Sequence, residues 1–169
     1  MKKHKESDLQ IQCVRWFRYQ YQAFARLLEH PHNEGNAFNS RQQAIANAEG
    51  VTKGVADLIL HVPSYITGEP SLRHSDCFHS LAIEMKTKTG RQSPEQRQWQ
   101  LLFEAAGGMY VVVRSFDEFQ QIVTKYMLNI PIDVAEAVAL AHLSIEERAK
   151  KKALEQFNDI IHPKKLRND

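Results

Sequence analysis

The chain has 169 residues, with 22 basic and 20 acidic side chains and a formal net charge of +2 at pH 7. This length is enough for one domain to bury a hydrophobic core without disulfides or structural metals. The net charge is too small to indicate nucleic acid by itself, and no apolar run has the length of a membrane span, so we expect no membrane partner. The charged first residues lack an apolar signal segment and the two cysteines form no framework, which predicts a cytoplasmic protein.

The first third of the chain predicts two helices with a short strand between them. Apolar residues at helical spacing predict a helix over residues 7–22, with Ser7 as its cap and Cys13 as a small core residue. Residues 24–29 fit either an extension of this helix or a short strand, and we favour the strand because the HPHNEGN segment that follows breaks regular structure. A second helix is predicted over 40–48.

The middle of the chain predicts two buried strands and a well-marked helix. Apolar runs over 54–62 and 78–86 predict the strands, and the aperiodic residues 63–78 predict a variable loop between them. A polar turn then leads to Ser93, which has Gln96 three residues later in the pattern of a capping box. The helix that begins there ends before a pair of glycines.

The remaining residues predict one more strand and a helical tail. Residues 109–113 predict a strand and 115–128 an amphipathic helix; beyond Pro131, we expect a helix over 134–143 and a second one capped by Ser144. The order of helices and strands predicts an α/β fold with a mixed sheet.

Two apolar runs carry acidic and basic residues that packing alone does not explain. Asp57 lies in the first run, and Glu84 and Lys86 stand two apart in the second, so the latter two point to the same face of a strand. Such a group suits a divalent cation, with Asp57, Glu84 and the backbone carbonyl of Met85 as ligands of Mg²⁺ or Mn²⁺. Lys86 would orient the attacking water or stabilise charge developing on a phosphate. An E-x-K alone is common at exposed strand edges, so the combination GVADLIL, IEMK and GRQSPEQRQW carries the prediction.

With these motifs, the chain resembles the PD-(D/E)xK nuclease superfamily and, within it, the VRR-NUC family of virus-type replication-repair nucleases. The resemblance covers about residues 6–122 and is closest to the small stand-alone members of phages and bacteria. Asp57, Glu84 and Lys86 match the D…E-x-K motif, and Gln96 matches the glutamine of the S-x-x-Q segment. The resemblance implies a restriction-endonuclease-like core, with a central mixed sheet flanked by helices, and a metal-dependent DNA endonuclease selective for branched structures such as flaps or Holliday junctions.

Other parts of the chain match the family less closely. Glu6 matches an acidic residue of the N-terminal helix that lies near the metal in related nucleases, and the segment His32–Gly35 resembles a P-N-E-G segment with His32 in place of proline. The family's Pro-Asp is Ala56-Asp57 here, which leaves the carboxylate in place. The resemblance implies a nuclease domain over 1–130 and leaves 131–169 as a helical extension, packed on the core or across a dimer.

Several candidates also have an ordinary structural interpretation. Gln96 is either a site residue or only the capping residue of its helix, and Glu6 either supports the metal or only favours the positive end of a helix. The residues expected to contact DNA, which could equally be solvated surface, are Lys88, Arg91, Arg97 and Asn33.

The resemblance leaves the substrate and the assembly open. We expect duplex or branched DNA as the partner and no small-molecule organic cofactor, while the alternatives are a nuclease acting on RNA and a catalytically silent DNA-binding module. A homodimer is expected because two active sites suit the cutting of two strands.

Overall fold

The computed structural model describes residues 3–31, 40–65 and 77–161. The chain divides into two compact units, Met1–Pro131 and Ile132–Asp169, and each is described by itself. The first unit contains the sheet and the predicted catalytic residues, and the second contains one long helix.

A four-stranded mixed sheet forms the centre of the first unit. Its order is β1-β2-β5-β6, with antiparallel pairing between β1 and β2 and between β2 and β5, and parallel pairing between β5 and β6. The four strands are β1 (Leu28–Glu29), β2 (Leu58–Leu60), β5 (Leu81–Met85) and β6 (Met109–Val113). The mixed α/β fold predicted from the order of elements is therefore confirmed.

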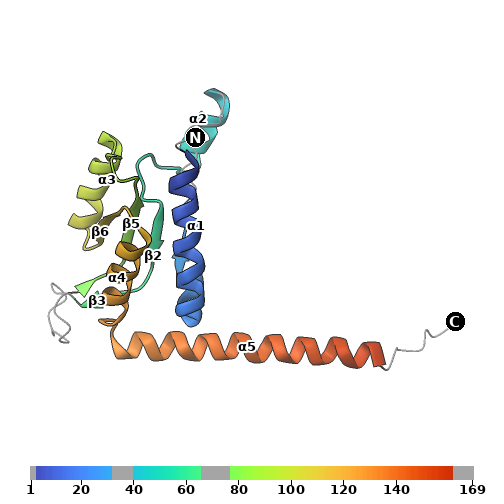
Figure 1. Cartoon of the computed structure of the whole chain (residues 1–169). Helices are drawn as coiled ribbons and strands as arrows, with labels where there is room; N and C mark the ends of the chain where they lie inside the picture. Colours follow the sequence, from blue (N-terminus) through green and yellow to red (C-terminus); the bar gives the residue numbers. More distant parts are fainter. Residues whose placement is uncertain (1–2, 32–39, 66–76, 162–169) are drawn as a thin grey trace. The chain divides into compact units, whose positions relative to one another are not determined.

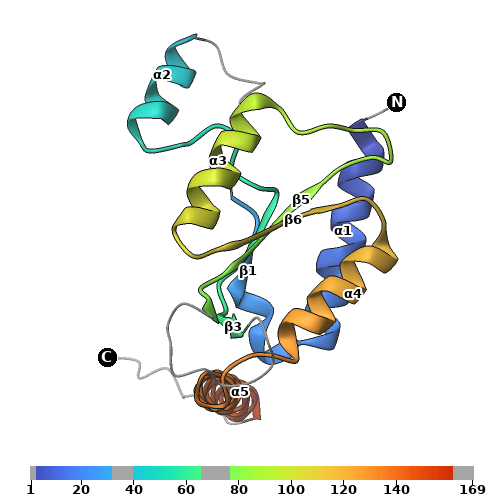
Figure 2. The ribbon, with the colours of Figure 1, turned by 90° about the vertical axis from the view of Figure 1, so that its left-hand side faces the viewer.

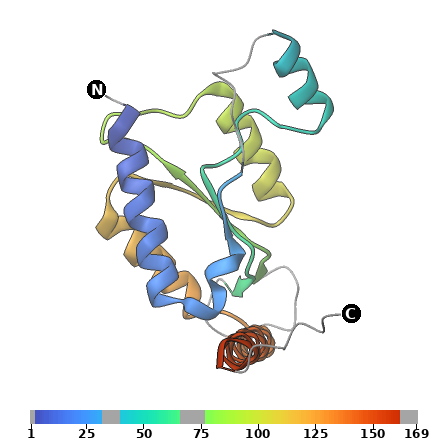
Figure 3. The same ribbon diagram turned by 90° about the vertical axis from the view of Figure 1, so that its right-hand side faces the viewer.

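Helices cover both faces of this sheet. Helices α1 (Lys3–Gln20) and α4 (Phe116–Met127) lie on one face, and α3 (Pro94–Ala105) lies on the other (Figures 1 and 2). The same arrangement is clear from the opposite side, where the strands run between α1 and α3 (Figure 3). The helix expected over 40–48 is present as α2 (Ser40–Ala48), followed by Gly50 at a φ of 93°.

The two sides of β5 bury different kinds of side chain. Leu81, Ile83 and Met85 are buried on the side of α1 and α4. The buried side chains that these two helices contribute are Cys13, Phe17, Phe119, Val123, Tyr126 and Met127. On the other side of β5, Ala82 packs with Ala56 and Tyr110 against Trp99 and Phe103, whose rings stack at 4.7 Å.

Cys13 is a core residue, as its helical spacing predicts. Its side chain is fully buried, and burial raises the pKa of its thiol to about 12. A thiol in this environment stays protonated and unreactive.

The start of the chain differs from the sequence prediction in two ways. Helix α1 begins at Lys3, so Ser7 lies inside it and the predicted Ser7 cap is wrong; Glu6 ties this first turn to the sheet by accepting a hydrogen bond from the Thr87 amide. The strand predicted over 24–29 is mostly wrong as well, because a 3₁₀ helix, η1 (Gln22–Leu27), reverses the chain before the two residues of β1.

The two buried runs also form shorter strands than predicted. The first strand is limited to β2, since Gly54 has a φ of 82° and the segment before Leu58 is irregular. The second run is split into β4 (Cys77–Phe78) and β5, and β4 pairs with β3 (Ser64–Tyr65) in a separate two-stranded sheet. The loop predicted between the runs therefore contains strand residues at both ends, and residues 66–76 lie outside the described part of the chain.

The described residues of the second unit form one helix, α5 (Ile132–Ile161), rather than the two that were predicted. The break at Ser144 is wrong: its hydroxyl donates to the Ala141 carbonyl at 2.9 Å, so the side chain bonds within a continuous helix and caps nothing. Among the described residues no single helix is long and apolar enough to cross a membrane, although α4 and the first part of α5 taken together reach that length and composition.

Candidate active site

Glu84 is a fully buried carboxylate held by three side chains from three different segments. Lys86 Nζ and Gln96 Nε2 each donate to Glu84 Oε1 at 2.5 Å, and the Tyr110 hydroxyl donates to Oε2 at 3.3 Å. Lys86 follows β5, Gln96 is in the first turn of α3, and Tyr110 is on β6. Glu84 and Lys86 share one face of the strand, as the alternation of side chains predicts.

The electrostatics of this site oppose the ionised form of Glu84. The pKa of Glu84 is raised to about 7, first by burial and second by the negative charge of Asp57. The hydrogen bond from Lys86, together with its positive charge, and the bond from Tyr110 act in the opposite direction. A carboxylate with this pKa is ionised near neutral pH only at a free-energy cost, which a nearby cation would remove.

Asp57 stands at the start of β2, where its side chain reaches the end of β5. Its Oδ2 accepts a hydrogen bond from the Met85 amide at 2.7 Å. Burial raises the pKa of Asp57, while the Met85 bond and the charge of Lys86 lower it. The two carboxylates are therefore both located at the end of β5. Glu84 belongs to the strand itself, and Asp57 is bonded to the backbone amide of the strand's last residue, Met85.

A glycine lets the segment before Asp57 approach helix α3. Gly54 has a positive φ, and a Cβ atom at this position would come within 2.5 Å of the Glu95 backbone. Only glycine combines this backbone conformation with such a close approach. The contact places the Asp57 segment beside the helix turn that carries Gln96.

Gln96 both caps its helix and contacts the Glu84 carboxylate. Its Oε1 accepts a hydrogen bond from the backbone amide of Ser93 at 2.8 Å, and the backbone amide of Gln96 donates to Ser93 Oγ at 3.2 Å, which completes the capping box. Because Oε1 is used by the cap, the Nε2 group is directed to Glu84. The cap thus orients the side-chain amide that contacts the carboxylate.

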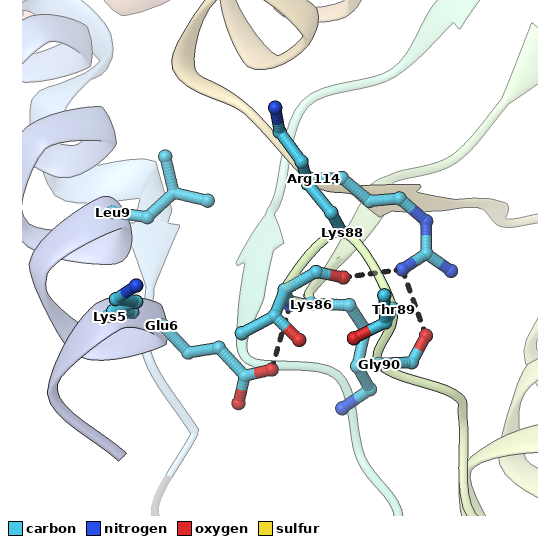
Figure 4. Close-up of a pocket in the computed structure, with 9 residues that line it drawn as sticks. Lys5, Glu6, Leu9, Lys86, Lys88, Thr89, Gly90 and Arg114 are labelled. Atoms are coloured by element: carbon cyan, nitrogen blue, oxygen red, sulfur yellow. Dashed lines mark hydrogen bonds between the residues drawn. The ribbon is translucent and has the colours of Figure 1, made fainter. Parts of the chain in front are cut away.

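Glu6 reaches the site from helix α1 through the turn that follows Lys86. Its Oε1 accepts from the Thr87 amide at 2.9 Å (Figure 4). Its charge also contributes to raising the pKa of Asp57, so the two carboxylates are close enough to interact. Glu6 therefore approaches Asp57 as a further acidic side chain, held by its bond to the backbone of the turn after Lys86.

Three of the four expected DNA-contacting residues belong to the described part of the chain and are exposed. Lys88 and Arg91 are exposed in and after the turn that follows β5, and Arg97, on α3, donates from Nη1 to the Gln92 carbonyl at 3.2 Å. The fourth, Asn33, lies outside the described residues, as does the whole segment His32–Gly35.

Three residues near the site were missed by the sequence prediction. Tyr110 contacts Glu84, as described above. His30 Nδ1 lies 2.6 Å from the Asp57 carbonyl oxygen and 3.1 Å from Gln10 Nε2. Arg114 donates from Nη1 to the carbonyls of Thr87 and Gly90, and so holds the turn after Lys86. Of these three, only Tyr110 could have been suspected from the sequence, since strand alternation places it on one face of 109–113. The strand pairing that brings it to Glu84 cannot be predicted from the sequence alone.

Comparison with known families and structures identifies the fold and its class of chemistry. The model of the VRR-NUC domain matches residues 1–117. The chain belongs to the VRR-NUC family. This is a family of nucleases, so its substrate is a nucleic acid.

A solved structure supports the same fold for this VRR-NUC chain. It is described as a VRR_NUC domain protein, is 20% identical, and superposes with a TM-score of 0.55 over 72% of this chain and 86% of that one. At this identity the likeness concerns the fold alone. No curated protein sequence matches the chain.

The residues of the VRR-NUC site fit a small divalent cation. Among the described residues, no three His, Cys, Asp or Glu side chains form a ready metal-binding group, so the side-chain donors are Asp57 and Glu84. Mg²⁺ is commonly bound by one or two carboxylates and completes its shell with water and substrate phosphate. The Met85 amide donates to Asp57, and a strand residue directs its N–H and C=O to the same side, so the Met85 carbonyl is directed to this side too. Two mutually repelling carboxylates with raised pKa values are a donor set that a cation would stabilise.

Proposed function

We propose that this VRR-NUC protein is a divalent-metal-dependent DNA endonuclease that hydrolyses phosphodiester bonds. The observation that carries the proposal is the buried Glu84 carboxylate, with Asp57 beside it and Lys86 bonded to its Oε1. A buried pair of acids with one ammonium group is costly for stability and useful for phosphoryl transfer, in which charge develops on oxygen and must be neutralised.

Each residue has a separate role in this proposal. Asp57, Glu84 and the Met85 carbonyl hold Mg²⁺ or Mn²⁺, which when bound supplies Lewis acidity toward water and the phosphate. Lys86 is placed by its bond to Glu84 to orient the attacking water or to stabilise the phosphate charge. Gln96 and Tyr110 hold the Glu84 carboxylate in one orientation. Glu6 fixes the turn that carries Lys86 into the site by bonding to Thr87.

The finer features of the substrate and assembly form part of the same proposal. We take the substrate to be duplex or branched DNA and the assembly to be a homodimer, because two copies would supply two active sites for two strands. Helix α5 supports the dimer, since it has exposed apolar side chains along its length, which are Ile132, Leu140, Leu143, Ile145 and Leu154.

The test is a cleavage assay on defined substrates. Labelled linear duplex, single strand, flap, four-way junction and an RNA strand are incubated with the protein in Mg²⁺, Mn²⁺ or EDTA. We expect cleavage of at least one DNA substrate in the presence of either metal and none in EDTA.

The controls separate this function from its alternatives. Asp57→Asn and Lys86→Gln should each abolish most of the cleavage while leaving DNA binding in EDTA measurable. DNA binding without cleavage by the wild type would instead support a catalytically silent DNA-binding module. Cleavage of the RNA strand alone would show that the substrate is RNA rather than DNA. Cleavage that is undiminished in both variants would refute the assignment of the site.

A further inference from the structure

A basic pocket lies next to the catalytic cluster, at the turn that follows Lys86. It has a volume of about 650 Å³ and is formed between the N-terminal part of α1, the turn after β5 and the end of β6 (Figure 4). Its lining residues are Lys5, Glu6, Leu9, Lys86, Thr87, Lys88, Thr89, Gly90 and Arg114. Lys86 therefore belongs both to this pocket and to the carboxylate cluster around Glu84.

The positive charges of this pocket outnumber its negative ones. Among the ion pairs of the described residues, none involves Lys5, Lys88 or Arg114. The acid that lines the pocket, Glu6, accepts the Thr87 amide with one of its oxygens. Lys86 is paired with Glu84, so the remaining three cationic side chains, Lys5, Lys88 and Arg114, stand against the single carboxylate of Glu6. This leaves the pocket with an excess of positive charge, which favours an anion.

Arg114 gives this pocket a fixed cationic wall. Its Nη1 donates to the Thr87 carbonyl at 2.7 Å and to the Gly90 carbonyl at 2.9 Å, so the guanidinium is held against the turn. A guanidinium has five N–H donors in a planar fork, and the two bonds from Nη1 leave the Nη2 edge available for a phosphate. Leu9 lies across the pocket from Arg114 and offers an apolar surface (Figure 4).

We propose that this pocket binds a second phosphate of the cleaved nucleic-acid strand, adjacent to the phosphate at the catalytic cluster. The inference rests on the proposed function, because Lys86 marks the position of the scissile phosphate. Phosphates of one strand recur about every 3.4 Å along a duplex axis, so a strand with one phosphate at Lys86 carries others to the neighbouring surface. Lys5, Lys88 and Arg114 would bind the phosphate, and Leu9 would contact the sugar or base attached to it.

The first test measures the number of phosphates that the pocket neutralises. Binding of a labelled DNA is followed by fluorescence anisotropy in EDTA at several salt concentrations for the wild type, Lys5→Gln, Lys88→Gln and the double variant. Both lysines are exposed, so these changes should leave the fold intact. We expect the slope of log K against log salt to fall by about 0.7 to 0.9 in the double variant, the value for one lost phosphate contact. The matched control is Lys125→Gln. Lys125 is exposed in the last turn of α4, whereas Arg114 of the pocket precedes the first turn, so this change should leave the slope unchanged.

The second test locates that phosphate. Single phosphates of the DNA are replaced in turn by neutral methylphosphonates, and each substrate is measured with the wild type and the double variant. At one position the replacement should weaken wild-type binding about fivefold and have no further effect in the double variant, because the two changes remove the same contact. In wild-type cleavage assays this position should be adjacent to the cut.

The outcomes distinguish the pocket from the proposed activity. The phosphate site would be refuted, even if the protein cleaves DNA, by a salt slope that is the same in the wild type and the double variant. It would also be refuted if each methylphosphonate weakened the binding of the double variant as much as it weakens the binding of the wild type. Coupling at one position without any cleavage would support the phosphate site and refute the endonuclease.

Discussion

The two faces of strand β5 use alternate residues of the same short strand for opposite purposes. On the side of α1 and α4, Leu81, Ile83 and Met85 are buried in an apolar layer. On the side of α3, Glu84 is buried just as completely but is charged or chargeable, and its neighbours are polar. One strand can therefore provide stability with one set of alternate residues and chemistry with the other. The free energy gained by burying the apolar face offsets the free-energy cost of burying Glu84 on the other face.

The largest expected effect comes from breaking the apolar face. Phe17→Ala removes a fully buried aromatic ring of α1, and such a change usually lowers the free energy of unfolding by about 3–5 kcal/mol. Cleavage per folded molecule should stay close to the wild-type rate, since Phe17 lies on the far side of the sheet from Glu84. Denaturant titration and activity assays normalised to the folded fraction measure the two quantities.

The matched control for Phe17 is another aromatic residue of the same helix. Tyr19 is 79% exposed, so Tyr19→Ala should change the free energy of unfolding by no more than about 0.5 kcal/mol. Equal losses in the two variants would mean that α1 does not pack on the sheet as described.

The next effect has the opposite sign and concerns the polar face. The folded pKa of Glu84, about 7, lies above its ordinary value of 4.5, so between these pH values the folded protein keeps a proton that the unfolded chain has released. Stability contributed by this group therefore falls as pH rises through that window. In Glu84→Gln the cost is absent, although Lys86 loses its partner, so we expect a gain of about 1–2 kcal/mol at pH 8 without metal.

The pH dependence of this difference is the decisive part of the measurement. Unfolding titrations from pH 4.5 to 8 should show the two proteins approaching equal stability at the acidic end, where Glu84 is protonated. Cleavage by Glu84→Gln should be abolished at every pH. A variant that is less stable than the wild type at pH 8 would show that ionised Glu84 stabilises the fold.

The smallest expected effect comes from a hydroxyl on the same face. The bond from Tyr110 lowers the pKa of Glu84, so Tyr110→Phe should raise that pKa and shift the acidic limb of the cleavage profile to higher pH by a fraction of a unit. The free energy of unfolding should change by about 1 kcal/mol or less, as for one hydrogen bond. An acidic limb that shifts to lower pH would contradict the contact between Tyr110 and Glu84.

Local patterns in the sequence predicted the parts of this site that depend on neighbouring residues. The capping box of Ser93 and Gln96 and the common face of Glu84 and Lys86 are both present, because helix caps and strand alternation are set within a few residues. The break at Ser144 shows the limit of the same reasoning, since a matching cap pattern lies inside a continuous helix.

Contacts between distant segments were beyond the reach of such patterns. Tyr110 reaches Glu84 because β5 and β6 pair in parallel with Ala82 opposite Tyr110. His30 reaches Asp57 because η1 turns the chain back from α1 into β1. Strand register and chain reversal depend on tertiary packing, which a single sequence does not display.

The most direct test of the proposed metal site is the binding of Mn²⁺, followed by electron paramagnetic resonance in the absence of nucleic acid. We predict that the wild-type protein binds the ion at a site that Asp57→Asn and Glu84→Gln each remove, with an affinity that falls as the pH drops below about 7, where Glu84 gains a proton. Mn²⁺ binding that is the same in the wild type and in both variants would show that these two carboxylates do not form the metal site.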